Sequence, residues 1–86
     1  MEDQVYQQKY YVYIIRCNDN THYVGRSKNI SDRLRRHKKG EVRYTCNRKP
    51  LQLITYCVFF DEYQAVLFEK YLKSGSGRAF AKRHLL

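Results

Sequence analysis

Proline and glycine are scarce in this sequence, which has one Pro and four Gly in 86 residues. The chain is 43% hydrophobic and 15% aromatic, whereas disordered linkers and low-complexity segments have few aromatic residues. A chain of this length forms one thin core, because only roughly 60–65% of its extended surface is buried on folding. We therefore expect a single domain over residues 1–86, with its core in about 10–80.

Cysteine is also scarce, and the three cysteines, Cys17, Cys46 and Cys57, are widely spaced. An odd number without a C-x-x-C pair predicts neither a disulfide framework nor a zinc site. The N-terminus has no charged segment followed by an apolar one, so we expect no secretory signal and a cytoplasmic location. Cys17 and Cys57 fall in predicted strands, where we expect both to be small buried hydrophobic residues.

Acidic residues are few, since eight Asp and Glu stand against 17 Lys and Arg, which gives a net charge of +9. Such an excess favours a polyanionic partner, because each neutralised phosphate releases condensed counterions. A merely soluble basic surface would explain the charge as well, so the charge by itself only favours nucleic acid. We expect no membrane partner, because no apolar run reaches the length of a membrane span and no basic amphipathic helix dominates.

The hydrophobic pattern predicts three short strands. Residues 10–17 carry β-branched and aromatic side chains on both alternating faces, which is typical of an interior strand. Asn and Asp dominate the turn at 18–21, and residues 22–26 resume as a strand, so this segment is predicted to be a β-hairpin. The run 51–60 is the third predicted strand.

Capping residues mark the start of the first predicted helix. Asn29 or Ser31 can cap a helix that runs to about Lys39, where Gly40 offers a stop. A basic loop at 41–50 connects this helix to the third strand.

A second helix is expected to begin at the cap Asp61 and to run to about Ser74. The glycines at 75–77 are expected to break it, and 78–84 is expected to add a last helical turn or two. The order β-β-α-β-α-α predicts an α+β fold, a small, mostly antiparallel three-stranded sheet flanked by helices.

Polar side chains lie on the face of the first helix that is expected to pack on the sheet. Ile30 and Leu34 define this inner stripe, His37 falls between them, and Arg33 borders it one turn earlier. A buried guanidinium is costly without a partner, so we expect an anion or another acceptor there. A plain basic protein-interaction domain would not explain this inward Arg and His.

The second helix carries an acidic side chain beside its inner stripe of Ala65, Phe68 and Leu72. Glu69 lies on the shoulder of that stripe, although it could simply be a surface group that pairs with Lys73 four residues on. The tyrosines of the strands also have an ordinary explanation, because most strand tyrosines serve as packing residues.

Taken together, these residues resemble the GIY-YIG nuclease module. The strand motifs are Tyr11-Val-Tyr13 and, ten residues on, Tyr23-Val-Gly25; Arg33 and His37 follow on a helix, and Glu69 on a later helix. The constellation from Tyr23 to His37 is the most specific part, and the resemblance covers about 10–80. One departure is Tyr11, which stands where the family has a glycine. A second departure is that no asparagine after Glu69 matches the late one of some members, and Ser76 or Arg78 could occupy that space.

The resemblance implies a metal-dependent endonuclease that hydrolyses phosphodiester bonds, most often in DNA. Tyr13, Tyr23, Arg33, His37 and Glu69 are the implied catalytic residues, with Mg²⁺ or Mn²⁺ on Glu69. Hydrolysis requires a base for water, and either tyrosine could serve, with a slight preference for Tyr23 and with His37 as relay or orienting group. Arg33 supplies a planar fork for phosphate oxygens. The alternative is a non-catalytic nucleic-acid-binding module on the same fold, which should have lost Glu69 or one of the tyrosines, whereas all five residues are present.

We expect no attached DNA-binding domain, so substrate contacts are expected to depend on the module's own basic surface, the substrate's structure or a targeting protein partner. Gly25, just after Tyr23, would let the backbone approach the substrate closely. The expected substrate-binding residues are Gly25, Arg26, Lys28, Arg35, Arg36, Arg43, Arg48 and Arg78. Base specificity, the choice between DNA and RNA and the oligomeric state stay open at this point.

Overall fold

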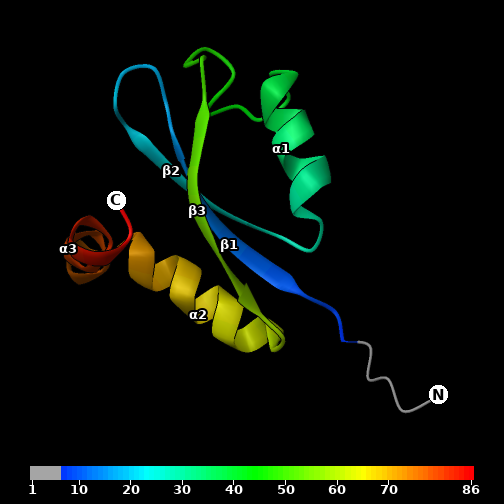
Figure 1. Ribbon diagram of the computed structural model, residues 1–86, viewed down its shortest axis with the longest axis vertical. Helices are drawn as coiled ribbons and strands as arrows, with labels where there is room; N and C mark the ends of the chain where they lie inside the picture. Colours follow the sequence, from blue (N-terminus) through cyan, green and yellow to red (C-terminus); the bar gives the residue numbers. More distant parts are fainter. Residues whose placement is uncertain (1–6) are drawn as a thin grey trace.

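The computed structural model describes residues 7–86 and confirms the α+β architecture in the expected order. The elements are β1 (Tyr10–Arg16), β2 (His22–Ser27), α1 (Ile30–Lys38), β3 (Gln52–Phe59), α2 (Glu62–Leu72) and α3 (Gly75–His84). The strands form one antiparallel sheet in the order β2-β1-β3, so the most apolar strand, β1, is the central one, as expected. Figure 1 shows α1 on one side of this twisted sheet and α2 with α3 on the other.

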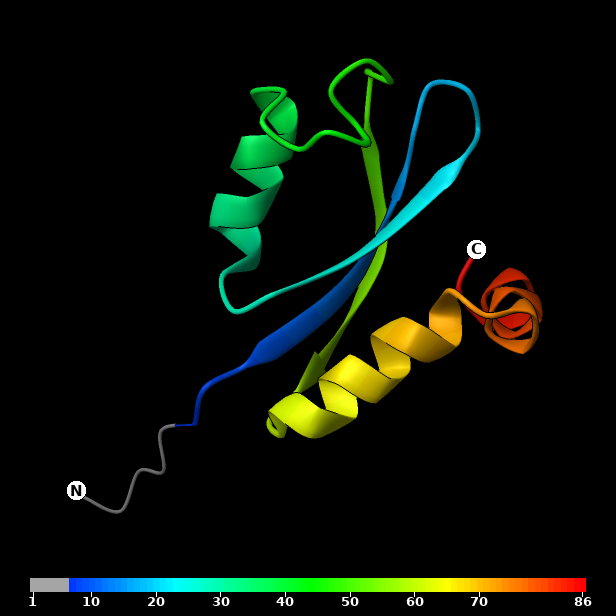
Figure 2. The same ribbon diagram turned by 180° about the vertical axis from the view of Figure 1, so that it is seen from behind.

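Alternation along β1 sends its side chains to these two sides in turn. Val12 and Ile14 belong to the apolar cluster that β1 forms with α2 and α3. Tyr13, between them, reaches His37 on α1. Both neighbours and Tyr13 are almost completely buried. β1 therefore supplies a purely apolar core on one side and, on the other, a mixed core in which the polar Tyr13 and His37 lie with the buried Ile15. Figure 2 shows the same division from behind.

The predicted helix caps are confirmed for α1 and α2. The Asn29 side chain accepts a hydrogen bond from the Asp32 amide, and Asp61 accepts one from the Tyr63 amide. These bonds satisfy amides that have no partner inside the helix. Gly40, with φ of +82°, takes the left-handed conformation that ends α1.

The glycines at 75–77 do not separate helical segments in the way that the sequence predicts. Both lie in the first turn of α3, and the Ser74 hydroxyl caps this helix by accepting a bond from the Gly77 amide. A Cβ on Gly77 would lie 1.6 Å from the carbonyl oxygen of Tyr71, whereas a Cβ on Gly75 would meet nothing within 4 Å. The predicted break between the two helices is therefore present, but it lies at 73–74, just before the glycines, and Gly77 serves close packing between α2 and α3.

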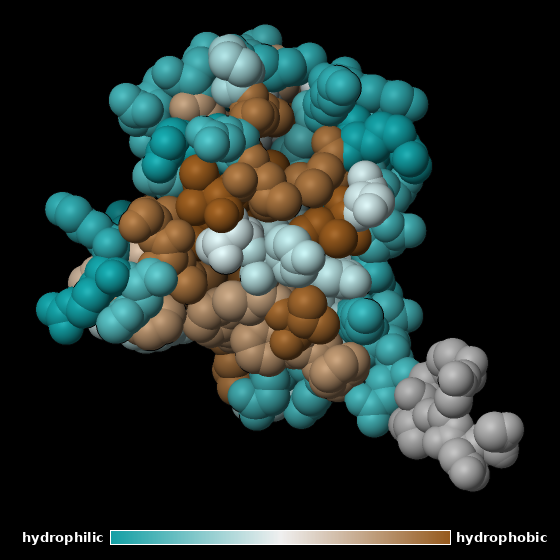
Figure 3. Space-filling model, in the orientation of Figure 1, coloured by the Kyte–Doolittle hydropathy of each residue, from teal (hydrophilic) through white to brown (hydrophobic). Residues whose placement is uncertain are grey.

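Burial differs between the central strand and the edge strand β3. Cys17 is buried as expected, but Cys57 on β3 is only half-buried, because an edge strand has a neighbour on one side only. Figure 3 shows apolar surface over β3 and α2, and large exposed hydrophobic residues there are Leu53, Tyr56, Val58, Phe60, Tyr63 and Leu67. No helix within 7–86 is both long and apolar enough to cross a membrane.

Candidate active site

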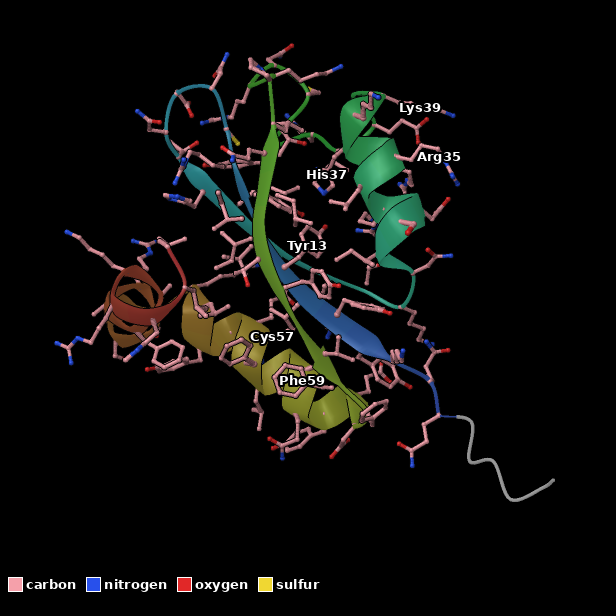
Figure 4. The ribbon with its side chains drawn as sticks, in the orientation of Figure 1. Tyr13, Arg35, His37, Lys39, Cys57 and Phe59 are labelled. Carbon is pink, nitrogen blue, oxygen red and sulfur yellow. The ribbon has the colours of Figure 1, made fainter. Side chains whose placement is uncertain are left out.

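A chain of hydrogen bonds runs through the side of the sheet that faces α1. The Tyr13 hydroxyl lies 2.9 Å from Nε2 of His37, and Nδ1 of His37 lies 2.7 Å from the hydroxyl of Thr45. The Thr45 hydroxyl in turn donates to the Val42 carbonyl at 3.4 Å. All three side chains are at most 1% exposed. Figure 4 shows Tyr13 and His37 turned toward one another between β1 and α1.

The direction of these bonds assigns the histidine tautomer. The single hydroxyl proton of Thr45 is used on Val42, so Thr45 accepts from Nδ1–H of His37. Nε2 of a neutral imidazole is then an acceptor, and the Tyr13 hydroxyl donates to it. A threonine in the loop between α1 and β3 therefore determines which way the tyrosine proton points.

The surroundings keep both ring systems neutral. Burial is the largest cause that lowers the pKa of His37, and together with the charges of Arg33 and Arg36 it brings this pKa to about 4. Burial is also the main cause that raises the pKa of Tyr13, with Tyr23 as the next cause and Arg33 acting against it. At neutral pH, Tyr13 thus holds its proton and His37 carries no charge.

Tyr23 completes an aromatic cluster around this chain. Its ring centroid lies 5.0 Å from that of His37, 6.2 Å from that of Tyr13 and 5.5 Å from that of Tyr44. Gly25 makes room for the cluster, because a Cβ there would lie 2.4 Å from the Tyr13 hydroxyl oxygen. Gly25 is buried, so its bare backbone faces Tyr13 and not an approaching substrate, in contrast to the sequence-based expectation.

Arg33 lies beside the cluster on the half-buried inner face of α1. It is close enough to affect the pKa values of both Tyr13 and His37. No ion pair within residues 7–86 involves Arg33. Its guanidinium is therefore a half-buried positive charge without a protein counter-ion in the described part of the chain, which is a suitable position for an external anion.

Glu69 lies on the other side of the edge strand β2. Its carboxylate is 3.6 Å from Nε of Arg26 and 2.9 Å from Nζ of Lys73, and its side chain is 19% exposed. Arg26 follows Gly25 on β2 and pairs in register with Val12, so it faces α2. The structure thus brings Tyr13, Tyr23, Arg33 and His37 together and places Glu69 across the edge strand from them. The pair with Lys73 is the alternative that the sequence left open.

Comparison with known proteins assigns the chain to a family. The family model described as GIY-YIG catalytic domain matches residues 9–83. The chain belongs to the GIY-YIG family. This assignment confirms the resemblance inferred from Tyr13, Tyr23, Arg33, His37 and Glu69, and it makes the chain a member of a nuclease family.

Relatives of this GIY-YIG protein include small proteins named UPF0213. One from Pediococcus pentosaceus is 40% identical over 65 residues, which cover 74% of this chain and 68% of the relative. Another from Staphylococcus saprophyticus is 38% identical over 64 residues, covering 73% and 77%. The solution NMR structure of a UPF0213 protein from Bacillus halodurans superposes with a TM-score of 0.57 at 27% identity, covering 87% of this chain and 83% of that one.

Glu69 fits a hard divalent cation of the kind that the GIY-YIG family implies. No group of three or more His, Cys, Asp or Glu side chains is gathered anywhere in 7–86, so the protein offers a single carboxylate. Mg²⁺ tolerates this, because it keeps several waters and shares its remaining positions with substrate phosphate. Lys73 is 55% exposed and can swing away from the carboxylate. Arg26 is the other cationic partner of Glu69. Its Nη1 is buried without a hydrogen-bond partner within the described residues, so this guanidinium can donate a further hydrogen bond.

The expected substrate-binding arginines differ in their partners. Arg48 bonds to Asp19 at 2.9 Å and lies 4.2 Å above the Tyr44 ring, so it ties the hairpin to the loop. Arg35 pairs with Asp32, and Arg36 pairs with Glu41 at 3.4 Å. Figure 4 shows Arg35 and Lys39 pointing away from the sheet, on the face of α1 opposite to His37.

Three other residues that were predicted to bind substrate have side-chain charges that remain available to it. Lys28 is exposed and lies 5.9 Å above the ring of Tyr10. Arg43 and Arg78 are exposed and form no ion pair within 7–86.

Sequence reasoning missed two residues of the site, Thr45 and Tyr44. Both lie in the loop at 41–50, which was interpreted only as basic. A threonine in a loop carries no periodic signal, so Thr45 could not have been found without its contact to His37. Tyr44 could have been suspected from its position among basic residues, a pattern that favours cation–π contacts.

Proposed function

We propose that this GIY-YIG protein is a metal-dependent endonuclease that hydrolyses phosphodiester bonds in DNA. The observation that supports this most directly is the buried chain from Tyr13 through His37 to Thr45, next to Tyr23 and to the unpaired charge of Arg33. A fully buried tyrosine–histidine–threonine relay costs desolvation of three polar groups and adds nothing that apolar packing could not provide. Membership of a nuclease family supports the same conclusion.

The direction of the relay distinguishes the two tyrosines. Tyr13 donates its proton to a neutral His37 and has a raised pKa, so it is a poor base at neutral pH. Tyr23 is less buried, and no strong histidine bond holds its proton. We therefore assign to Tyr23 the removal of a proton from the attacking water, and to Tyr13 the positioning of that water through its free lone pairs.

Charge that develops on the phosphate requires fixed positive groups. Arg33 would bind non-bridging oxygens with its planar fork, since its guanidinium has no protein counter-ion within 7–86. Glu69 would hold the divalent cation, which supplies Lewis acidity to the phosphate when bound. Lys73, released from Glu69 by that cation, would then be available to the substrate backbone.

The proposal is tested by incubating labelled DNA with the protein in Mg²⁺, Mn²⁺ or EDTA. We expect cleavage with either metal and none in EDTA. Glu69→Ala should reduce the cleavage rate by roughly 10³-fold or more while binding is retained, because it removes the proposed metal ligand. Lys70→Ala, which changes an exposed residue of the same helix, is the matched control. Full activity in Glu69→Ala would remove Glu69 from the site.

A second experiment tests the assignment of the tyrosines. Tyr23→Phe should lower kcat by roughly 10²-fold or more, since it removes the proposed base. Tyr13→Phe should lower kcat less, because it removes only a positioning group and leaves the proposed base in place. Both rates are measured in single turnover across pH 6–9. The reverse order of effects would make Tyr13 the base.

The second candidate function is a nucleic-acid-binding module without activity. The ion pairs of Glu69 with Arg26 and Lys73 favour it, because they satisfy the carboxylate without a metal. Binding that is sensitive to salt, together with no cleavage of duplex, branched or single-stranded DNA or RNA in any metal, would support this function instead.

A further inference from the structure

A basic pocket adjoins the proposed site on the side of the sheet that faces α2 and α3. Its volume is about 910 Å³, which lies in the range of pockets that hold organic ligands. The floor is apolar, with Ile14, Val24, Leu72 and Ala81, and the rim carries the cations Arg16, Lys73, Arg78 and Lys82. None of the lining residues is Asp or Glu.

The cations of this rim have little protein charge to neutralise them. Of the four, only Lys73 forms an ion pair within the described residues, and its partner is Glu69. Arg78 and Lys82 are exposed and stand one turn apart on one face of α3. Arg16, Arg78 and Lys82 line one pocket without an ion pair inside 7–86, so they repel one another, and an external anion between them would relieve that repulsion.

The pocket is continuous with the proposed catalytic residues. Tyr23, whose ring packs against His37, lines one part of it, and Lys73, which binds Glu69, lines another. The pocket therefore extends around the edge strand β2, between the two groups of residues that this strand separates. Tyr44 and His22 also line it and add aromatic surface.

We propose that this pocket binds a nucleotide of the nucleic-acid strand that adjoins the scissile phosphate, with the base over the apolar floor and the phosphates on Arg16, Arg78 and Lys82. A nucleotide matches the pocket because it joins a flat, weakly polar base to a polyanionic backbone. A strand fits better than a free nucleotide, since the pocket opens onto Tyr23 and Lys73 at the proposed site. The inference rests on the proposed function only for the nature of the ligand.

The experiment measures binding of a labelled oligonucleotide in EDTA between 50 and 300 mM NaCl, so that no cleavage is required. Arg78→Gln with Lys82→Gln should weaken binding roughly tenfold to hundredfold at 0.1 M salt and make the salt slope shallower by about 1.5 to 2. Lys70→Gln with Arg83→Gln is the matched control, since it removes the same charge from exposed positions on α2 and α3 outside the pocket. We expect the control to lose less than about threefold.

Each outcome decides between the pocket and the alternatives. Equal losses in the pocket variant and the control would overturn the inference, because they would show a general positive field. Displacement of the strand by a deoxynucleoside monophosphate at equal nucleotide concentration would also overturn it, in favour of a free-nucleotide site. If the wild-type protein cleaves DNA and the pocket variant binds like the control, the pocket is rejected and the endonuclease is retained. If only the pocket variant loses binding and the wild-type protein cleaves in no metal, the endonuclease is rejected and the pocket is retained.

Discussion

The two sides of the sheet are built in opposite ways from one central strand. On the side of α2 and α3, Val12 and Ile14 pack against Ala65, Leu72 and Ala81 in a purely apolar cluster. On the side of α1, Tyr13 alternates with them and bonds to His37, which in turn bonds to Thr45. The apolar Ile15 is buried beside this chain.

The difference separates stability from chemistry. Apolar burial contributes free energy roughly in proportion to area and tolerates small shifts. A buried hydrogen-bonded chain contributes little net free energy, but it fixes directions and loses its function when one member is removed. The α2 and α3 side should therefore determine whether the domain folds, and the α1 side should determine what the folded domain can do.

The largest expected effect concerns the close contact of α2 and α3. Gly77→Ala should lower the free energy of unfolding by about 3 kcal/mol or more, because a Cβ would overlap the Tyr71 carbonyl and force the helices apart. Gly75→Ala, in the same helical turn, meets open space and should range from no change to a gain of about 1 kcal/mol. Urea unfolding followed by circular dichroism measures both. Equal effects would mean that the helices are not packed as described.

A smaller effect is expected from the histidine on the α1 side. Its pKa falls from 6.5 to about 4 on folding, so the unfolded chain binds more protons than the folded one between these values. The free energy of unfolding should therefore have its full value above pH 6.5 and should fall by roughly 2 to 4 kcal/mol as the pH decreases to 4. The two other histidines, His22 and His84, are exposed. His37→Gln should flatten this decrease in urea titrations, and an unchanged acid limb would assign it to other groups.

Among the destabilising changes, Thr45→Val should have the smallest effect on stability, and its effect on activity should be larger than its effect on stability. Thr45→Val removes the acceptor of Nδ1 of His37 and should cost about 1 to 3 kcal/mol. It also allows the other tautomer, in which Nε2 carries a proton and can no longer accept from Tyr13, so cleavage should fall more than stability explains. Thr45→Ser keeps the hydroxyl and should restore the rate. A Thr45→Val protein with full activity would contradict the relay.

Local chemistry made most of the fold predictable. Alternating apolar residues gave the strands, and the caps Asn29, Asp61 and Gly40 gave helix ends that the structure reproduces. The helix break was predicted at the glycines of 75–77 but lies just before them, because a glycine can either end a helix or leave room for close packing. Only the position of Tyr71 decides between them.

The candidate site was predictable where helix periodicity applied. The inward positions of Arg33 and His37 followed from a turn of 100° per residue. The partner of His37 did not, because Thr45 lies in an irregular loop whose path no pattern specifies. The place of Glu69 across the edge strand was equally hidden, since it depends on which face of the sheet α2 covers and not on any spacing in the chain.

The free edge of β3 has a consequence for handling the protein. Residues 51–60, which include this strand, contain no charged side chain, and natural edge strands commonly use charge or proline to prevent pairing with other chains. Here the net charge of +9 elsewhere on the molecule makes copies repel one another. High salt or excess polyanion screens that repulsion, so colloidal stability should be lowest in the mixtures used to study DNA binding, and light scattering should accompany every titration.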